Sequence, residues 1–327
     1  MSRSNGSLRV IKPDAAPVEV PIAVLKAIFL YPGVAITDPA ERLILAWGII
    51  ILRLNQSGYL KGVSISPQHF PDYTLLKKQI ELEQNEEWRT ELGKTIARSK
   101  LKSQSAYLRY RHKTSIKKGQ RFDYLLEGAE KIEQLEAKLR NSSNLWRIRG
   151  IEGKASRIYF DSLGRFLREK GFNFYGRKYR PNPDLVNATL SYGYAVLRGY
   201  VYIATVAAKL MPYPGILHED HTHNKMALVY DLMEEFRVAV VDSIVLKLLL
   251  NKQLNLKHVK REGQAVLLNS LGREVLIKAI VNRTLEEFRH PETGERAELK
   301  EIIVKQALRL ASAIKHEKTY RPFYLLP

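Results

Sequence analysis

The fold class of most of the chain follows from one stretch, Leu228-Val-Tyr-Asp-Leu-Met-Glu-Glu-Phe-Arg-Val-Ala-Val-Val-Asp-Ser-Ile-Val-Leu-Lys-Leu-Leu-Leu250. Its apolar residues recur every three or four positions and form a single stripe, made of Leu228, Leu232, Phe236 and Ala239. This spacing predicts an amphipathic helix whose apolar side is buried in a core.

Similar helical patterns run from about Asp72 to the end of the chain. They are apolar on one face in Leu185–Leu197 and Leu299–Ile314, and charged and amphipathic in Glu127–Leu139. Long patterns with few prolines are typical of helical domains. We therefore predict an all-α domain over residues 78–327.

The N-terminal part has a different character. Short runs rich in β-branched residues are broken by prolines, as in strands joined by turns. These runs are residues 18–20, 28–30, 34–37 and 49–52. A helix is predicted from Pro39 to about Trp47, because Asp38 can cap it. With a linker at 67–71, this predicts an α+β multidomain fold in which a small β-rich domain, residues 1–77, precedes the larger all-α domain.

The composition indicates a polyanionic partner. The 327 residues include 53 Lys and Arg against 34 Asp and Glu, a formal charge of +19, and 45% of them are hydrophobic. DNA, RNA or an anionic membrane surface would balance this charge. The chain has no cysteine, which excludes disulfides, thiolate zinc sites and cysteine nucleophiles.

No membrane-spanning segment is predicted. The most apolar stretches, residues 43–54 and 238–250, fall below the roughly 20 apolar residues that a spanning helix needs. The N-terminus has Lys12 and Asp14 where a secretory signal has an apolar core. We therefore expect a cytoplasmic protein with nucleic acid, and not a membrane, as its partner.

Positive charge is concentrated between Leu92 and Phe122, a segment with ten Lys or Arg residues and no Asp or Glu. Cations neutralise phosphates and release counterions. A solvated helix face is the alternative, but such a face usually carries acids four residues from its bases. From this segment and a second basic cluster at 165–180, the candidates for DNA contact are Arg98, Lys102, Arg109, Arg111, Lys113, Arg177, Lys178 and Arg180.

Three segments carry candidate metal ligands, and the first is Gly150-Ile-Glu152-Gly153. Glu152 lies between two glycines at an expected helix start. Glycines let a ligand approach closely, and a helix start tolerates an acid. A simple helix-start acid is the structural alternative.

The second segment is a polar loop, Gly215-Ile-Leu-His218-Glu-Asp-His221-Thr-His223. Its three histidines offer a zinc site, although neutral-histidine zinc sites usually show a helical pair or a cysteine partner. A solvated polar loop is the alternative for His221 and His223.

The third segment belongs to the opening stretch. Asp231 and Glu234 are three residues apart and share a helical face. Acids beside a buried stripe are costly unless a cation partners them, so we expect either a metal or pairing with Arg237 or Lys225. Carboxylates combined with an imidazole suit Mg²⁺ or Mn²⁺, which would polarise a phosphate and stabilise a leaving oxygen.

These segments together resemble the CRISPR-associated integrase family, the first Cas protein of spacer acquisition, over nearly the whole chain. The motifs occur in order: Ala97-Arg-Ser-Lys-Leu-Lys-Ser-Gln104, Gly150-Ile-Glu-Gly-Lys-Ala-Ser-Arg-Ile-Tyr-Phe160, Arg180-Pro-Asn-Pro-Asp-Leu-Val-Asn-Ala-Thr-Leu-Ser-Tyr-Gly-Tyr-Ala195, Gly215-Ile-Leu-His218, Tyr230-Asp-Leu-Met-Glu-Glu-Phe-Arg237 and Tyr320-Arg-Pro-Phe323. The ordered series is specific, whereas no single motif is.

The resemblance implies an N-terminal β domain that carries the homodimer contact, followed by a helical catalytic domain. The implied metal ligands for Mg²⁺ or Mn²⁺ are Glu152, His218 and Glu234. Asp231 is implied to be adjacent and catalytic, with Asn187 and Tyr192 supporting the site.

The implied activity is integration, in which the 3′-hydroxyl of a foreign DNA fragment attacks a phosphodiester at the CRISPR repeat boundary. Family members also cut branched DNA, so double-stranded, branched or 3′-overhang DNA is the expected partner. The usual protein partner is the small second Cas protein, which bridges two dimers.

Two alternative functions stay open on the sequence. A non-catalytic DNA-binding component would use the acids only for structure. A transposase-like or minimal integrase would act without the second Cas protein, an interpretation suggested by an N-terminal domain shorter than the family's. The loop after His218 also lacks the Gly-Arg-x-Ser common in the family.

Overall fold

The computed structural model describes residues 1–4, 6–11, 15–179, 181–218 and 226–326. The chain divides into two compact units, Met1–Asp72 and Tyr73–Pro327. Residues 73–77, the last of the predicted N-terminal domain, belong to a helix that begins at Tyr73.

The described residues of the smaller unit form two three-stranded sheets. The first is antiparallel, with the strands β1 (Ser2–Ser4), β2 (Ser7–Val10) and β3 (Val18–Pro21) in sequence order. The second has the strands β4 (Ala27–Leu30), β5 (Ile50–Leu54) and β6 (Leu60–Ser64), with β4 parallel and β6 antiparallel to β5. Helix α1 (Asp38–Ala46) connects β4 to β5, and short 3₁₀ turns lie at Ile22–Val24 and Pro67–His69.

One predicted strand in this unit is wrong. Residues 34–37 form no strand. They lead from a turn at Gly33, which has a φ of +88°, to Thr37, whose extended backbone forms the N-cap of α1. The amide of Thr37 donates to the Met1 carbonyl at 3.1 Å. The β-branched composition of this run therefore reflects a short extended connection and not sheet pairing.

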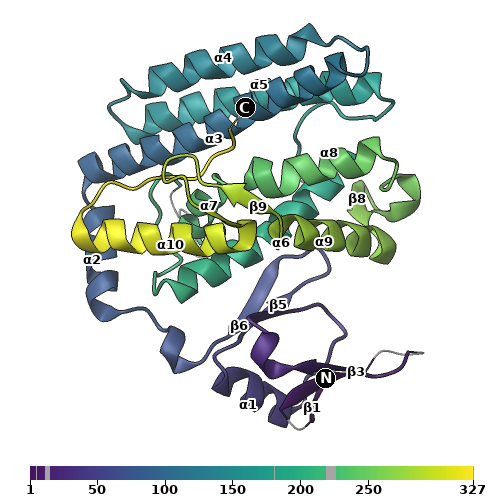
Figure 1. The fold of residues 1–327 in the computed structure, drawn as a ribbon, viewed down its shortest axis with the longest axis vertical. Coiled ribbons are helices and arrows are strands. Elements are labelled where there is room, and N and C mark those ends of the chain that lie inside the picture. The colour runs from purple at the N-terminus through teal and green to yellow at the C-terminus, as the bar shows by residue number, and fades with distance from the viewer. Residues whose placement is uncertain (5, 12–14, 180, 219–225, 327) are drawn as a thin grey trace. The chain divides into compact units, whose positions relative to one another are not determined.

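The larger unit is built mainly from helices, which confirms the predicted fold class (Figure 1). Its helices are α2 (Tyr73–Glu83), α3 (Glu86–Ile116), α4 (Asp123–Leu139), α5 (Leu145–Glu169), α6 (Leu185–Ala207), α7 (Ala227–Met233), α8 (Ser243–Leu250), α9 (Ser270–Thr284) and α10 (Leu299–His316). It also contains a 3₁₀ turn (Leu256–His258) and two antiparallel hairpins, β7 (Val259–Glu262) with β8 (Ala265–Leu268) and β9 (Glu287–Arg289) with β10 (Arg296–Glu298).

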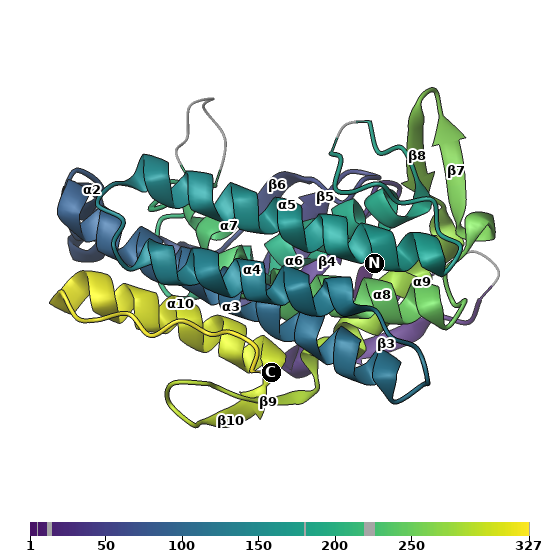
Figure 2. The ribbon, with the colours of Figure 1, turned by 90° about the horizontal axis from the view of Figure 1, so that it is seen from above.

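The helices of this unit form two groups. Helices α3, α4 and α5 pack against one another as one bundle (Figures 1 and 2). The second group centres on α6, which packs against α7, α9 and α10 and is buried along most of its length. No helix in the described part of the chain is long and apolar enough to cross a membrane.

The stretch from residue 228 to 250 is not one regular helix. Helix α7 ends at Met233, and Arg237–Asp242 form a π-helical turn before α8 begins. Hydrogen bonds from residue i to i+5 widen a helix at such a turn. Arg237 and Asp242, which are five residues apart, both line one cavity of the helical unit. Single π-helical turns are frequent at functional sites.

Gly150 offers a test of how open one face of α5 is. An alanine Cβ there would meet no atom within 4 Å, so Gly150→Ala is expected to raise the free energy of unfolding by about 1 kcal/mol through helix propensity. In the control Gly193→Ala, on α6, the Cβ would lie 2.6 Å from Val241 Cγ1. A stiff valine would have to move, and we expect a loss of about 1–3 kcal/mol. Urea unfolding measures both, and a destabilised Gly150→Ala would contradict an open face.

Candidate active site

Glu152 lies in the second turn of α5 and not at the start of the helix. Asn144 caps this helix by accepting a hydrogen bond, at 2.9 Å, from the backbone amide three residues on. The interpretation of Glu152 as a helix-start acid is therefore wrong. Its Oε1 accepts a hydrogen bond from Ser156 Oγ at 2.9 Å and contacts the ammonium of Lys100.

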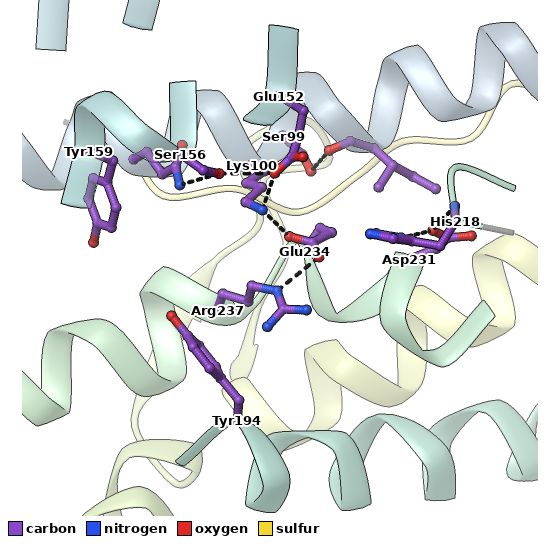
Figure 3. Close-up of polar contacts among 12 residues, drawn as sticks. Ser99, Lys100, Glu152, Ser156, Tyr159, Tyr194, His218, Asp231, Glu234 and Arg237 are labelled. Carbon is purple, nitrogen blue, oxygen red and sulfur yellow. Dashed lines mark hydrogen bonds and ion pairs between the residues drawn. The ribbon is translucent and has the colours of Figure 1, made fainter. Parts of the chain in front are cut away.

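The backbone of residues 216–218, which includes His218, is bound by Asp231. The Asp231 carboxylate, on α7, is fully buried. It accepts hydrogen bonds from the backbone amides of Ile216, Leu217 and His218 at 2.6, 3.1 and 3.0 Å. Its Oδ1 is also 2.6 Å from His218 Nδ1. A proton on Nδ1 leaves a free lone pair on Nε2. Figure 3 shows the imidazole directed toward Glu234. A ring nitrogen bonded to a carboxylate, with the other nitrogen left open, is the arrangement usual for metal-binding histidines.

Glu234 directly follows α7 and pairs with two cations. It is 2% exposed. Its Oε2 is 2.7 Å from Lys100 Nζ, and its Oε1 is 2.9 Å from Arg237 Nε. Burial raises the pKa of Glu234, but the charges of Arg237 and Lys100 outweigh burial and bring the pKa to about 2. The carboxylate is therefore ionised in the folded protein.

The ammonium of Lys100 joins Glu152 to Glu234 (Figure 3). Lys100 comes from α3, Glu152 from α5 and Glu234 from the end of α7, so three distant segments meet at one point. Burial lowers the pKa of Lys100, but the two carboxylates raise it to a net value above its ordinary one. Burial also lowers the pKa of His218, while the hydrogen bond and charge of Asp231 raise it, with a net rise.

A cavity of about 440 Å³ adjoins this point. Its lining includes Lys100 and the three predicted metal ligands, Glu152, His218 and Glu234, whereas Asp231 is not among the lining residues. The cavity also has a basic and aromatic wall, made of Arg157, Tyr175, Arg177, Lys178 and Tyr179. Acids and bases thus line the same space, which suits a phosphodiester together with a cation.

The donor set fits a divalent metal. Glu152 and Glu234 converge on one cationic position, and His218 lines the same cavity, so two carboxylates and an imidazole are available. Mg²⁺ and Mn²⁺ accept this mixture. Among the described residues, His, Asp and Glu side chains do not already form a cluster of three or more around one point, and the Lys100 ammonium lies between the two glutamates.

Four residues named in the sequence predictions lie outside the described ranges. They are Arg180, His221, His223 and Lys225. The alternative zinc site through His218, His221 and His223 therefore stays a prediction, as does pairing of an acid with Lys225 and DNA contact by Arg180.

Two of the basic residues predicted to contact DNA pair with acids of α4. Arg98 Nε is 2.7 Å from Glu136, and Arg109 makes two 2.7 Å hydrogen bonds to Glu133. These acids lie beyond the acid-free segment in the sequence, which is why the segment looks unpaired when it is read alone. The geometry favours a structural role for Arg98 and Arg109.

The other described candidates divide between the cavity and the rest of the surface. Arg177 and Lys178 line the cavity. Lys102 and Arg111 lie over aromatic rings, 4.2 and 5.1 Å from the ring centroids. Lys113 is exposed near the end of α3. Arg177 and Lys178 are therefore the candidates placed closest to the predicted metal ligands.

Asn187 supports the basic wall from the buried side. Its Oδ1 accepts hydrogen bonds from the backbone amide of Lys178 at 2.8 Å and from the Arg177 guanidinium at 2.9 Å. Tyr192 is buried in α6 and is not among the residues that line the cavity, whereas Tyr194 on the same helix is. The geometry thus connects Asn187 to the cavity, and support of the site by Tyr192 stays a prediction.

Sequence reasoning missed Lys100 and Tyr194. The Tyr194 hydroxyl donates to Asp242 at 2.5 Å, and Arg237 lies 4.9 Å from the centre of the tyrosine ring. Burial raises the pKa of Asp242 to about 6, against the opposing effect of the tyrosine hydrogen bonds.

A signal for Lys100 was present, because its helical neighbours three and four residues away are small or uncharged. A lone charge on such a buried face needs a partner.

The chain matches known proteins along most of its length. Residues 1–282 match the family model described as CRISPR associated protein Cas1. A curated relative, CRISPR-associated endonuclease Cas1 1 of Thermus thermophilus, is 37% identical over 306 residues, which cover 93% of this chain and 90% of the relative.

Solved structures share the fold. A CAS1 protein from Thermotoga maritima has a TM-score of 0.80 at 22% identity, with 97% of this chain and 94% of that chain covered. A casposase bound to integration product has a TM-score of 0.79 at 19% identity, with 99% and 91% covered. As the ordered motifs predicted, the chain belongs to the CRISPR-associated Cas1 family.

Proposed function

We propose that this protein is a divalent-metal-dependent DNA endonuclease and integrase that inserts DNA fragments into a CRISPR array. The main support is the convergence of Glu152 and Glu234 on one cationic position, beside His218, in a cavity with a basic wall. The Thermus relative is named an endonuclease, and the casposase of similar fold is bound to integration product. Both agree with phosphodiester chemistry at this site.

Glu152, His218 and Glu234 would hold the Mg²⁺ or Mn²⁺ ion. When bound, the ion supplies positive charge that stabilises the phosphate and the leaving oxygen. Asp231 keeps the proton of His218 on Nδ1 and so directs Nε2 to the site. In this proposal Asp231 is a positioning residue that acts through His218, in place of the direct catalytic role implied by the resemblance.

Arg157, Arg177 and Lys178 would bind the DNA backbone from the basic wall. They line the same cavity as the carboxylates, so a phosphate held by them lies close to the cationic position. The 3′-oxygen of the incoming fragment bonds to the phosphorus, and the 3′-oxygen of the cut strand leaves. One phosphodiester replaces another, and no protein nucleophile is required, in agreement with a chain that lacks cysteine.

Assembly is proposed on family membership. The N-terminal domain, predicted as residues 1–77, would carry the homodimer contact, and the small second Cas protein would bridge two dimers. DNA with branches or 3′ overhangs would be the substrate. Cytoplasmic localisation belongs to the same proposal.

The test of the metal site is Glu152→Ala. We expect joining of a labelled DNA fragment into a repeat-containing plasmid to fall more than about 100-fold in Mg²⁺ or Mn²⁺. Even the loss of a residue that only hydrogen-bonds a metal ligand lowers metal affinity or activity 10- to 100-fold. DNA binding without metal should persist, because the basic wall is intact. Joining at the wild-type rate by this variant would contradict the proposed site.

Glu136→Ala is the matched control. Glu136 is also a largely buried glutamate paired with a cation of α3, since its Oε1 is 2.7 Å from Arg98. It does not line the cavity. We expect this variant to join DNA at close to the wild-type rate, which separates loss of a metal ligand from loss of an interhelical ion pair.

A further inference from the structure

Lys100 occupies the place where the two candidate metal-binding carboxylates meet (Figure 3). Its Nζ is 2.7 Å from Glu234 Oε2 and also contacts Glu152 Oε1. Its side chain is 11% exposed. The other oxygen of Glu234 pairs with Arg237 at 2.9 Å. Two negative charges are thus balanced by two positive charges in a largely buried cluster.

A divalent ion at the position of the Lys100 ammonium would compete with it for these oxygens. Mg²⁺ binds carboxylate oxygens at about 2.0–2.1 Å, and an ammonium has three donors and no lone pair with which to join the coordination shell. Adding a divalent ion while both Lys100 and Arg237 stay would place four positive charges against two carboxylates. Moving one cation away from the carboxylates would remove part of this repulsion.

Lys100 is the cation that is free to move. Arg237 lies 4.9 Å from the centre of the Tyr194 ring, and Tyr194 is hydrogen-bonded to the buried Asp242. Lys100 instead carries its charge on a flexible four-carbon stem and lines the cavity. A rotation of that stem moves the ammonium from the carboxylates into the space where the proposal above places a DNA phosphate.

We propose that Lys100 is a built-in competitor of the metal, which neutralises Glu152 and Glu234 in the metal-free protein and moves to a DNA phosphate when the metal binds. This inference rests on the proposed function. Because a phosphate gives the displaced ammonium a new partner, DNA favours metal binding, and by reciprocity the metal favours DNA binding. The site is therefore stable without metal and becomes fully loaded only in the presence of its substrate.

The experiment measures Mn²⁺ affinity by electron paramagnetic resonance, with and without a short DNA duplex. Lys100→Met removes the competing charge while keeping an unbranched side chain that is only one atom shorter. Without DNA, we expect this variant to bind Mn²⁺ about tenfold more tightly than wild type, within the usual range of coupling between sites. DNA should tighten Mn²⁺ binding by a larger factor in wild type than in Lys100→Met, because only wild type has an ammonium to displace, and DNA joining by the variant should be reduced.

Lys94→Met is the matched control. Lys94 lies on the same helix, its side chain is 13% exposed, and it pairs with Glu91 at 2.6 Å outside the cavity. This variant should keep the wild-type Mn²⁺ affinity. Thermal unfolding gives a second readout that also applies to an unstable variant, since Mn²⁺ should raise the Tm of Lys100→Met more than that of wild type.

The possible failures are distinguishable. Equal or weaker Mn²⁺ binding by Lys100→Met, with Mn²⁺ bound normally by wild type, overturns the competitor role and leaves the metal site standing. No Mn²⁺ binding by either protein, with or without DNA, overturns the proposed function and the competitor role together. Lys100→Gln, which keeps two N–H donors for the carboxylates without the charge, should behave as Lys100→Met does.

Discussion

Glu234→Ala is expected to abolish DNA joining and to destabilise the helical unit at the same time. The carboxylate is the shared partner of two buried cations, Lys100 and Arg237. Removing one member of a buried ion pair leaves an uncompensated charge and costs about 3–5 kcal/mol. The loss of a proposed metal ligand should lower joining more than about 100-fold. Chemical denaturation and plasmid-joining assays measure the two effects.

The neighbouring acid provides the control. Glu235 is also fully buried, but its partners are neutral: the Tyr320 hydroxyl, the Gln306 amide and the backbone amide of Phe323. Burial raises the pKa of Glu235 to about 7, so Glu235→Gln removes only about half a charge at neutral pH. We expect it to keep joining activity within a few-fold of wild type. If Glu234→Ala and Glu235→Gln behaved alike, the special role of Glu234 would be wrong.

Asp231→Ala is expected to have the second large effect, because one carboxylate binds three consecutive backbone amides, those of residues 216–218, and the imidazole of His218. Three backbone amides lose their acceptor. At roughly 1–3 kcal/mol for each buried unpaired group, the free energy of unfolding should fall by about 3 kcal/mol or more. His218 also loses the partner of its Nδ1, and metal affinity should fall 10- to 100-fold.

A positioning role for Asp231 has a signature that destabilisation alone does not produce. Nitrogen NMR of His218 should show the proton fixed on Nδ1 in wild type and shared between both ring nitrogens in Asp231→Ala. Asp242→Ala is the control, since Asp242 is another buried aspartate of the same segment and accepts hydrogen bonds from Tyr159 and Tyr194. It should lower stability and leave the His218 tautomer unchanged. An unaltered tautomer in Asp231→Ala would refute the positioning role.

Much of the fold was predictable because its causes are local. Helix α4 was predicted to end at Leu139, as it does, and α10 begins at Leu299 as predicted. The spacing of apolar residues and the residues that start and end helices act over short distances along the chain. They can therefore be recognised in a single sequence. The run at 34–37 failed for the complementary reason. Its β-branched residues favour extended backbone, but strand formation also requires a partner strand, which no local pattern specifies.

The interruption of the opening stretch shows the same limit. Its apolar stripe predicts a helix across residues 228–250, and helices do form at both ends. The π-helical turn between them brings Arg237 and Asp242 to one cavity. Tyr194 of α6 contacts both residues there. A pattern of hydrophobic residues contains no information about such contacts between distant segments.

Glu152, His218 and Glu234 could be named from the amino-acid order, because each stands in a motif that resembles one family's. Their counter-charges could not. Lys100 reads as one of ten bases in an acid-free run, yet it is the partner of both glutamates. Arg98 reads the same way and pairs with Glu136 of another helix. Hydrophobic periodicity is a property of neighbouring residues, whereas an ion pair depends on the distance between two side chains, which exists only once the helices have packed.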